Sequence, residues 1–168
     1  MNKLFSGLLF LFLIIFPNIN ANAYADSGIV IDGNLSDWNN RPSIHTKKYK
    51  ASFINQGEKA YAYVSCKENL PSKYQISLNS HRSYLIVMKK EKIGKGKTKK
   101  IECWLKKNNK KISLKAVEHR NKRTKNENIE IEVPLGKLEK GVNQSTIVTF
   151  SSLNSFDLSI TTGGVNTF

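Results

Sequence analysis

The residues best placed to do chemistry in this chain are lysines. Between positions 89 and 125 there are 16 lysines and arginines against three glutamates, a net charge of +13. The rest of the chain after residue 25 is electrically balanced. So concentrated a field attracts anionic polymers and anionic membranes, and it weakens with salt. We therefore expect one basic binding surface; the alternative is a charged surface that only keeps the protein soluble.

The lysines expected to contribute most lie in or beside two turns, at 93–97 and 106–111, that look like hairpin tips. We expect neighbouring hairpins to project them on one side, where they would act as point charges with little geometric selectivity. They are Lys95, Lys97, Lys99, Lys100, Lys106, Lys107, Lys110 and Lys111.

Trp104 is the candidate stacking platform. In the run 101–105, strand alternation places Ile101, Cys103 and Leu105 on one face and Trp104 on the other, among lysines. Exposed aromatic rings bind sugars by stacking, so Trp104 predicts a ligand contact. If both faces are covered, it is simply a core residue. Tyr49, Tyr74 and Tyr84 are weaker candidates for the same role.

Two cysteines, Cys66 and Cys103, lie in strand-like runs. Outside the cytosol a lone pair of this kind often forms a disulfide between strands. Two buried free thiols are the equal alternative.

No residues form a recognisable catalytic set. His45, His81 and His119 lie in separate polar segments, and no motif joins one of them to a cysteine nucleophile. The glycines at 94 and 96 fit a flexible hairpin tip better than a nucleotide-binding loop. No spacing of metal ligands occurs. We predict a binding protein rather than an enzyme.

The first 25 residues have the layout of a secretory signal peptide. A basic start at Lys3 is followed by an apolar run at 4–16, a break at Pro17, and small residues at 21, 23 and 25. The apolar run is shorter than the ~20 residues of a spanning helix. We expect cleavage after residue 23 or 25 and a secreted protein, released or held at the cell surface by its ligand, with a single domain over 26–168.

Short runs rich in β-branched and aromatic residues, bounded by Gly, Asn, Pro or Ser, predict strands throughout that domain. We expect them at 29–31, 49–54, 60–66, 74–78, 84–89, 99–106, 111–119, 129–133, 145–150 and 156–161. Alternation in 129–133 predicts a strand whose glutamates face water. With no helix of useful length, the pattern predicts an all-β antiparallel sandwich of the jelly-roll or immunoglobulin-like kind.

Several residues have structural rather than ligand roles. Asp32 and Gly33 suit a tight turn, because glycine adopts a positive φ freely and aspartate caps the turn. Trp38 is expected to plug the core with its indole N–H bonded to the backbone, and Asp37 to fix the same turn. Pro134 ends the strand at 129–133.

Three segments in order resemble the family 9 carbohydrate-binding module and its DOMON-like relatives. They are IVIDGNLSDW at 29–38, KAYAYVSCKEN at 59–69 and NIEIEVPLGKL at 128–138. The resemblance covers most of the predicted domain and implies a β-sandwich that binds carbohydrate. The resemblance also suggests structural calcium, because members of the family often hold it. Here only Asp26, Asp32 and Asp37 are near the opening turn, too few for a hard cation. We therefore expect no cofactor and keep calcium as an alternative.

Three functions fit these features. The leading hypothesis is a binding module for an anionic polymer or polysaccharide of the cell envelope or surroundings; an anionic membrane surface would meet the same lysines. The second is a neutral-sugar module that uses Trp104. The third is a surface protein that docks an acidic protein partner. Nucleic acid would bind only non-specifically, through its phosphates.

Overall fold

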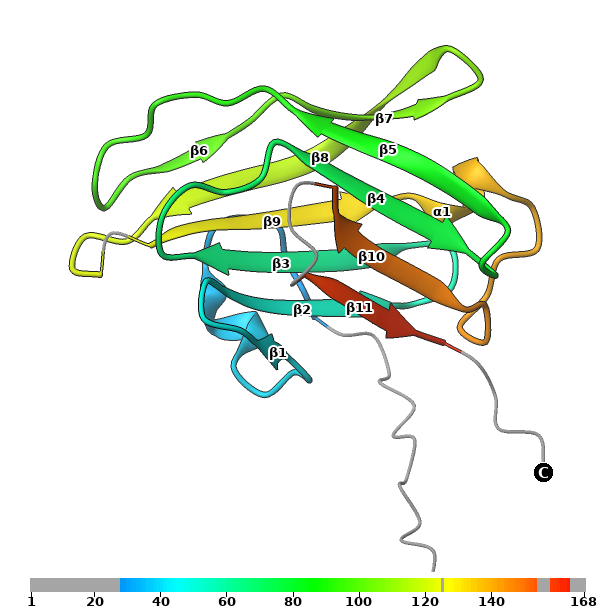
Figure 1. Cartoon of the computed structure of the whole chain (residues 1–168), viewed down its shortest axis with the longest axis horizontal. Helices are drawn as coiled ribbons and strands as arrows, with labels where there is room; N and C mark the ends of the chain where they lie inside the picture. The colour runs from blue at the N-terminus through cyan, green and yellow to red at the C-terminus, as the bar shows by residue number, and fades with distance from the viewer. Residues whose placement is uncertain (1–27, 125, 154–157, 164–168) are drawn as a thin grey trace, which may run out of the picture.

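The computed structural model describes residues 28–124, 126–153 and 158–163 (Figure 1). The predicted signal peptide, residues 1–25, and Asp26 lie outside the described residues. In chain order the elements are the 3-10 turn η1 (Leu35–Trp38), β1 (Ile44–His45), β2 (Tyr49–Asn55), β3 (Ala60–Cys66), β4 (Lys73–Leu78), β5 (Arg82–Met88), β6 (Thr98–Lys100), β7 (Cys103–Lys107), β8 (Lys110–Arg120), β9 (Glu127–Val133), α1 (Leu135–Leu138), β10 (Val148–Ser152) and β11 (Ser159–Thr162).

In the described part of the chain the strands form one antiparallel sheet in the order β1-β2-β3-β9-β8-β7-β5-β4-β10-β11, with β6 added on β8. The long strand β8 serves both halves of this sheet. Its first residues pair with β7 and its last residues with β9 and β6. We call β1, β2, β3, β9 and β6 half-sheet A, and β7, β5, β4, β10 and β11 half-sheet B. Because β11 also contacts β2, the sheet nearly closes around its core. The predicted all-β antiparallel class is confirmed.

The core lies between the two half-sheets and is filled by alternate residues of each strand. Phe150 stacks on Phe53 and on Tyr74, with ring centroids 5.4 and 5.1 Å apart. Phe53 lies on half-sheet A and Tyr74 on half-sheet B, so this stack joins the two halves. Burial of such aromatic rings contributes strongly to core stability.

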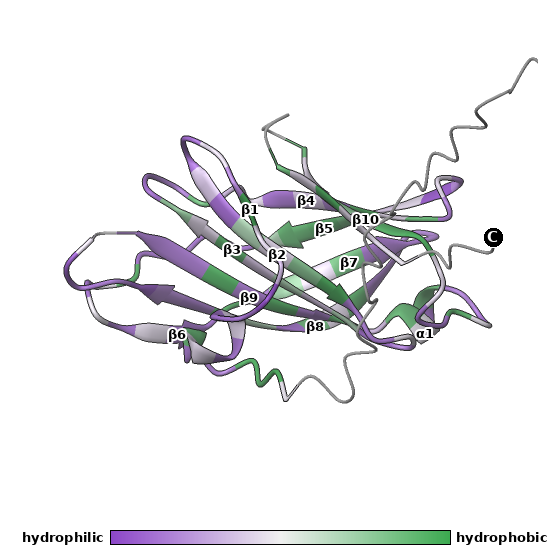
Figure 2. Cartoon of the chain, turned by 90° about the horizontal axis from the view of Figure 1, so that it is seen from below, coloured by the Kyte–Doolittle hydropathy of each residue, from purple (hydrophilic) through white to green (hydrophobic). Residues whose placement is uncertain are grey.

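Half-sheet A has a second apolar layer on its outer face. Residues 28–38 run across it, and Ile29, Ile31 and Trp38 pack there against Tyr61, Tyr63 and Val117. Figure 2 shows the hydrophobic start of this segment beside β6 and β8. The strand predicted at 29–31 is therefore wrong: these residues form no ladder and instead cover a sheet face.

This cover also overturns the prediction for β9. Ile129, Ile131 and Val133 face the core as expected, but Glu130 is only 1 % exposed because the N-terminal segment lies over it. Glu132 beyond the cover is half-buried and pairs with Lys59 at 3.0 Å. Two glutamates that look equivalent in the sequence thus lie in different environments.

The strand predicted at 99–106 is two strands. β6 pairs with Val117–His119 of β8, whereas β7 pairs with β5 and with residues 110–114 of β8. The break at 101–102 falls where β8 passes from one half of the sheet to the other. The chain stays beside β8 across this break, because β6 and β7 keep the same register against β8 and the Ile101 amide donates to the Ala116 carbonyl oxygen at 3.1 Å.

Candidate functional site

The lysine-rich hairpin between β7 and β8 is closed by two asparagines in the left-handed region. Asn108 has φ 47° and Asn109 has φ 60°. Two positive φ values give a two-residue turn whose twist matches the flanking strands. The turn fixes the register, so that Lys107 lies opposite Lys110 and Lys106 opposite Lys111.

This register places Trp104 on the outer face of half-sheet B, opposite the buried side chains of Cys103 and Leu105. One row across the strands consists of Lys73, Val87, Trp104 and Ser113. The next row consists of Gln75, Leu85, Lys106 and Lys111. We call the outward side chains of these two rows the Trp104 face. It carries three lysines and no acidic residue.

A direct contact joins the two rows. The Nζ atom of Lys111 lies 4.5 Å from the centroid of the Trp104 ring. A cation over an indole face is attracted by about 0.5–1 kcal/mol at an exposed site. The ring is half-buried, and its Nε1 atom is buried without a hydrogen-bond partner. The Lys111 ammonium therefore lies over a ring that is only partly exposed to a ligand.

Beyond this face toward β11, half-sheet B presents small hydroxyl groups. Ser77 and Ser83 lie 2.8 Å apart, and the Gln75 amide donates to the Ser83 hydroxyl at 2.9 Å. Thr149 and Thr161 are linked in the same way at 2.8 Å. Sequence reasoning missed this polar extension, although the alternating serines and threonines of β4, β5 and β10 were its signal.

The predicted ligand lysines do not gather on one side, and that expectation is corrected. Lys95, Lys97, Lys99 and Lys100 lie in or just before β6, which pairs with the far end of β8. Lys106, Lys107, Lys110 and Lys111 flank the turn at its near end. At ~3.4 Å per residue along β8, the two groups are about 30 Å apart. Figure 1 shows β6 and the β7–β8 hairpin at opposite ends of the molecule.

Two of these lysines have partners within the fold. Lys107 Nζ donates to the carbonyl oxygen of Lys137 at 3.0 Å and also to that of Leu138, where helix α1 ends. Lys99 forms an ion pair with Glu91. Lys106, Lys110 and the lysines at 95, 97 and 100 are exposed.

Two of the three tyrosines predicted as weaker stacking platforms are too buried to contact a ligand. Tyr49 is 9 % and Tyr74 0 % exposed, and both belong to the main core. Tyr84 is half-buried, and its hydroxyl donates to the Leu138 carbonyl oxygen at 3.5 Å.

The opening turn holds its residues by hydrogen bonds within the fold. Asp32 Oδ1 accepts from the amide of Asn34 at 2.7 Å, and Asp37 Oδ2 accepts from the amide of Val30 at 3.0 Å. Gly33 has φ 88°, and a Cβ atom there would lie 2.4 Å from Thr98 Cγ2. Only glycine fits this approach to β6.

Trp38 is buried on the outer layer of half-sheet A, where it stacks on Tyr63 at 5.5 Å. We expected the indole N–H to donate to the backbone. It donates instead to the Glu130 carboxylate. Pro134 is half-buried and directly follows β9, ahead of α1.

Cys66 and Cys103 are separate free thiols, both buried, and not a disulfide. Burial raises the pKa of both thiols, that of Cys103 to about 12. Neither is suited to act as a nucleophile at neutral pH.

Among the described residues, no three His, Cys, Asp or Glu side chains lie together as metal ligands. The helices of this same part of the chain are also too short to cross a membrane.

The chain matches no known family model, and searches of curated proteins and of solved structures found no significant match.

Proposed function

We propose that this chain is a secreted, non-catalytic domain that binds an anionic polymer of the cell envelope or surroundings through the Trp104 face. The observation that carries the proposal is the Lys111 ammonium over the Trp104 ring, 4.5 Å from its centroid. Lys106 lies directly opposite Lys111 on the neighbouring strand, and Lys73 lies in the same row as Trp104.

The same observation favours an anionic ligand over a neutral sugar. A pyranose that stacks on the ring at the Lys111 side displaces this ammonium, and it offers no charge in return. A carboxylate, sulfate or phosphate group instead binds that ammonium and leaves the ring for the neighbouring part of the polymer. Two opposed lysines repel each other across the hairpin, and an anion between them relieves the repulsion.

The basic start, the apolar run and the small residues of 1–25 support export within this proposal. Within this proposal the finer architecture is a β-sandwich, supported by the two half-sheets on either side of one core. We also propose kinship with family 9 carbohydrate-binding modules on the three resembling segments, of which the first contacts the other two. Trp38 of the first resembling segment stacks on Tyr63 of the second and bonds Glu130 of the third.

The test is binding of the purified protein to a polyuronate, with a neutral glucan of similar length as the control ligand. Lys106→Gln/Lys111→Gln is compared with Lys95→Gln/Lys97→Gln, which removes the same charge at the other end of β8. We expect the first pair to weaken polyuronate binding about tenfold at low salt and the second to weaken it much less.

Three outcomes distinguish the candidate functions. Salt-sensitive binding that depends on the 106/111 pair supports the proposal. Equal losses in both pairs mean that only overall charge attracts the polymer, and they contradict a defined face. Salt-insensitive binding of the glucan that Trp104→Ala abolishes supports the neutral-sugar function instead.

A further inference from the structure

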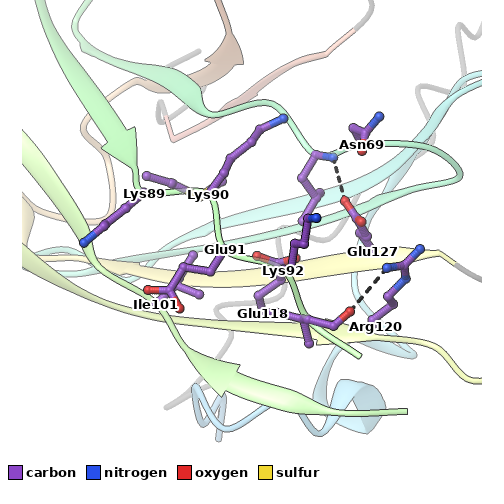
Figure 3. A pocket seen from close by; sticks show the side chains of 12 residues that line it. Asn69, Lys89, Lys90, Glu91, Lys92, Ile101, Glu118, Arg120 and Glu127 are labelled. Carbon is purple, nitrogen blue, oxygen red and sulfur yellow. Dashed lines mark hydrogen bonds between the residues drawn. The ribbon is translucent and has the colours of Figure 1, made fainter. Parts of the chain in front are cut away.

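A cavity of about 390 Å³ opens at the end of the molecule near β6, away from the Trp104 face. It lies between the loop after β5 and the ends of β8 and β9 (Figure 3). Leu70, Met88, Ile93 and Ile101 give it apolar walls. Its volume is within the ~300–1,000 Å³ typical of sites for small molecules.

Glu118 on β8 lines this cavity and is the unusual group in it. The residue is 7 % exposed, and in the described part of the chain its carboxyl group forms no hydrogen bond or ion pair, although the positive charges of Lys90 and Arg120 act on it. Burying a carboxylate without a partner is unfavourable. Burial, and after it the nearby Glu127 carboxylate, raises the pKa of Glu118 to about 7. A group of this kind facing a cavity is a candidate ligand contact.

The other charged groups that line the cavity are Lys89, Lys90, Glu91, Lys92, Arg120 and Glu127. Four of them have partners in the fold, and of these Lys89 pairs with Glu102 at 3.5 Å. Glu91 pairs with Lys99, and Glu127 Oε2 accepts from the Leu70 amide at 3.2 Å. Arg120 donates to the Ile93 carbonyl oxygen at 3.2 Å, although its Nε atom is buried without a partner. The exposed lysines at 90 and 92 and the buried carboxyl of Glu118 are therefore left for a ligand.

We propose that this cavity binds a small zwitterion, with its primary ammonium group on Glu118 and its acidic group on Lys90 and Lys92. A short apolar spacer between the two groups contacts Leu70 and Met88. A simple cation is disfavoured because it must pass the two lysines. A simple anion is disfavoured because Glu118 and Glu127 repel it inside the cavity. The proposal is independent of the Trp104 face.

An ammonium group beside Glu118 favours the ionised carboxylate. Affinity for the zwitterion is therefore expected to rise as the pH increases from 6 to 8, through the pKa of Glu118, and then to level off.

Calorimetric titration with 6-aminohexanoate tests the site, with hexylamine and hexanoate as matched single-charge probes. We expect 6-aminohexanoate to bind at least about tenfold more tightly than either. Glu118→Gln keeps the shape of the side chain. We expect it to weaken the affinity for 6-aminohexanoate at least about tenfold. Glu58→Gln is the control, because Glu58 is exposed and lies outside the cavity.

Circular dichroism of each variant verifies that it is folded. The proposal is overturned if 6-aminohexanoate does not bind, or if hexanoate binds as tightly. It is also overturned if a folded Glu118→Gln protein binds 6-aminohexanoate as the parent does.

Discussion

The indole of Trp38 donates a 2.7 Å hydrogen bond to a carboxylate oxygen of Glu130, a residue 92 positions later in the chain. The second oxygen of Glu130 accepts from the amide of Gly33. One buried carboxylate therefore attaches the whole N-terminal cover to the centre of half-sheet A. Burial raises the pKa of Glu130, and these two hydrogen bonds oppose that effect.

Removing this carboxylate is expected to destabilise the protein. Glu130→Ala leaves the buried Trp38 indole and the part-buried Gly33 amide without an acceptor, which costs about 2–4 kcal/mol in the free energy of unfolding. Glu132→Gln breaks only a partly exposed ion pair with Lys59, and we expect a change below about 0.5 kcal/mol. Chemical denaturation of both variants measures the difference. Equal effects would show that the buried position of Glu130 has no energetic consequence.

The two tryptophans should respond to the same substitution with changes in stability of different size. Trp38→Phe removes the donor to Glu130 and is expected to cost about 2 kcal/mol or more. Trp104→Phe loses apolar contact area but also removes a buried indole N–H that has no partner. Because these two effects oppose each other, we expect the free energy of unfolding to change by less than about 1 kcal/mol. Thermal unfolding followed by circular dichroism compares them. A larger loss for Trp104→Phe would contradict the environments described for both residues.

Glu118 makes stability depend on pH with a definite sign. Its pKa rises from an ordinary value of 4.5 to about 7 in the folded protein, so the folded state holds the proton more tightly. This contribution is fully present below about pH 4.5 and is lost as the pH rises through 7. The loss is on the order of 3 kcal/mol.

Glu118→Gln cannot titrate and is expected to be more stable than the parent at pH 8 while losing that advantage near pH 4.5. Denaturant midpoints at several pH values measure this. Parallel curves for the two proteins would contradict the raised pKa, and Glu102→Gln supplies the baseline for an exposed glutamate.

The buried thiols are expected to be unreactive in the folded protein. Cys66 and Cys103 are 2 % exposed each, and burial raises both pKa values. An aromatic disulfide reagent at pH 8 should label neither within minutes, and both after denaturation. Two thiols detected after denaturation without reductant identify the free state, whereas none would identify a disulfide. Rapid labelling of the folded protein would show that one strand end opens readily.

The sequence by itself determined most of the strands and the alternation of their side chains. Runs of β-branched and aromatic residues predicted β2, β3, β4, β5, β8 and β9 closely. It also placed Trp104 on the face opposite Cys103 and Leu105, because successive side chains of a strand point to opposite sides. These results follow from local backbone geometry, which is determined by residues close together in the sequence.

Only the tertiary structure decided which of those faces is covered. Alternation separates Glu130 from Ile131 but cannot show that residues 28–38 fold over one face and bury Glu130. Charge counting found the basic segment, yet the length of β8 separates its lysines into two groups. Glu118 gave no signal in the sequence, because its cavity forms where a loop after β5 meets β8 and β9. In each case the physical cause is a contact between segments far apart in the chain, and local sequence does not encode the partner.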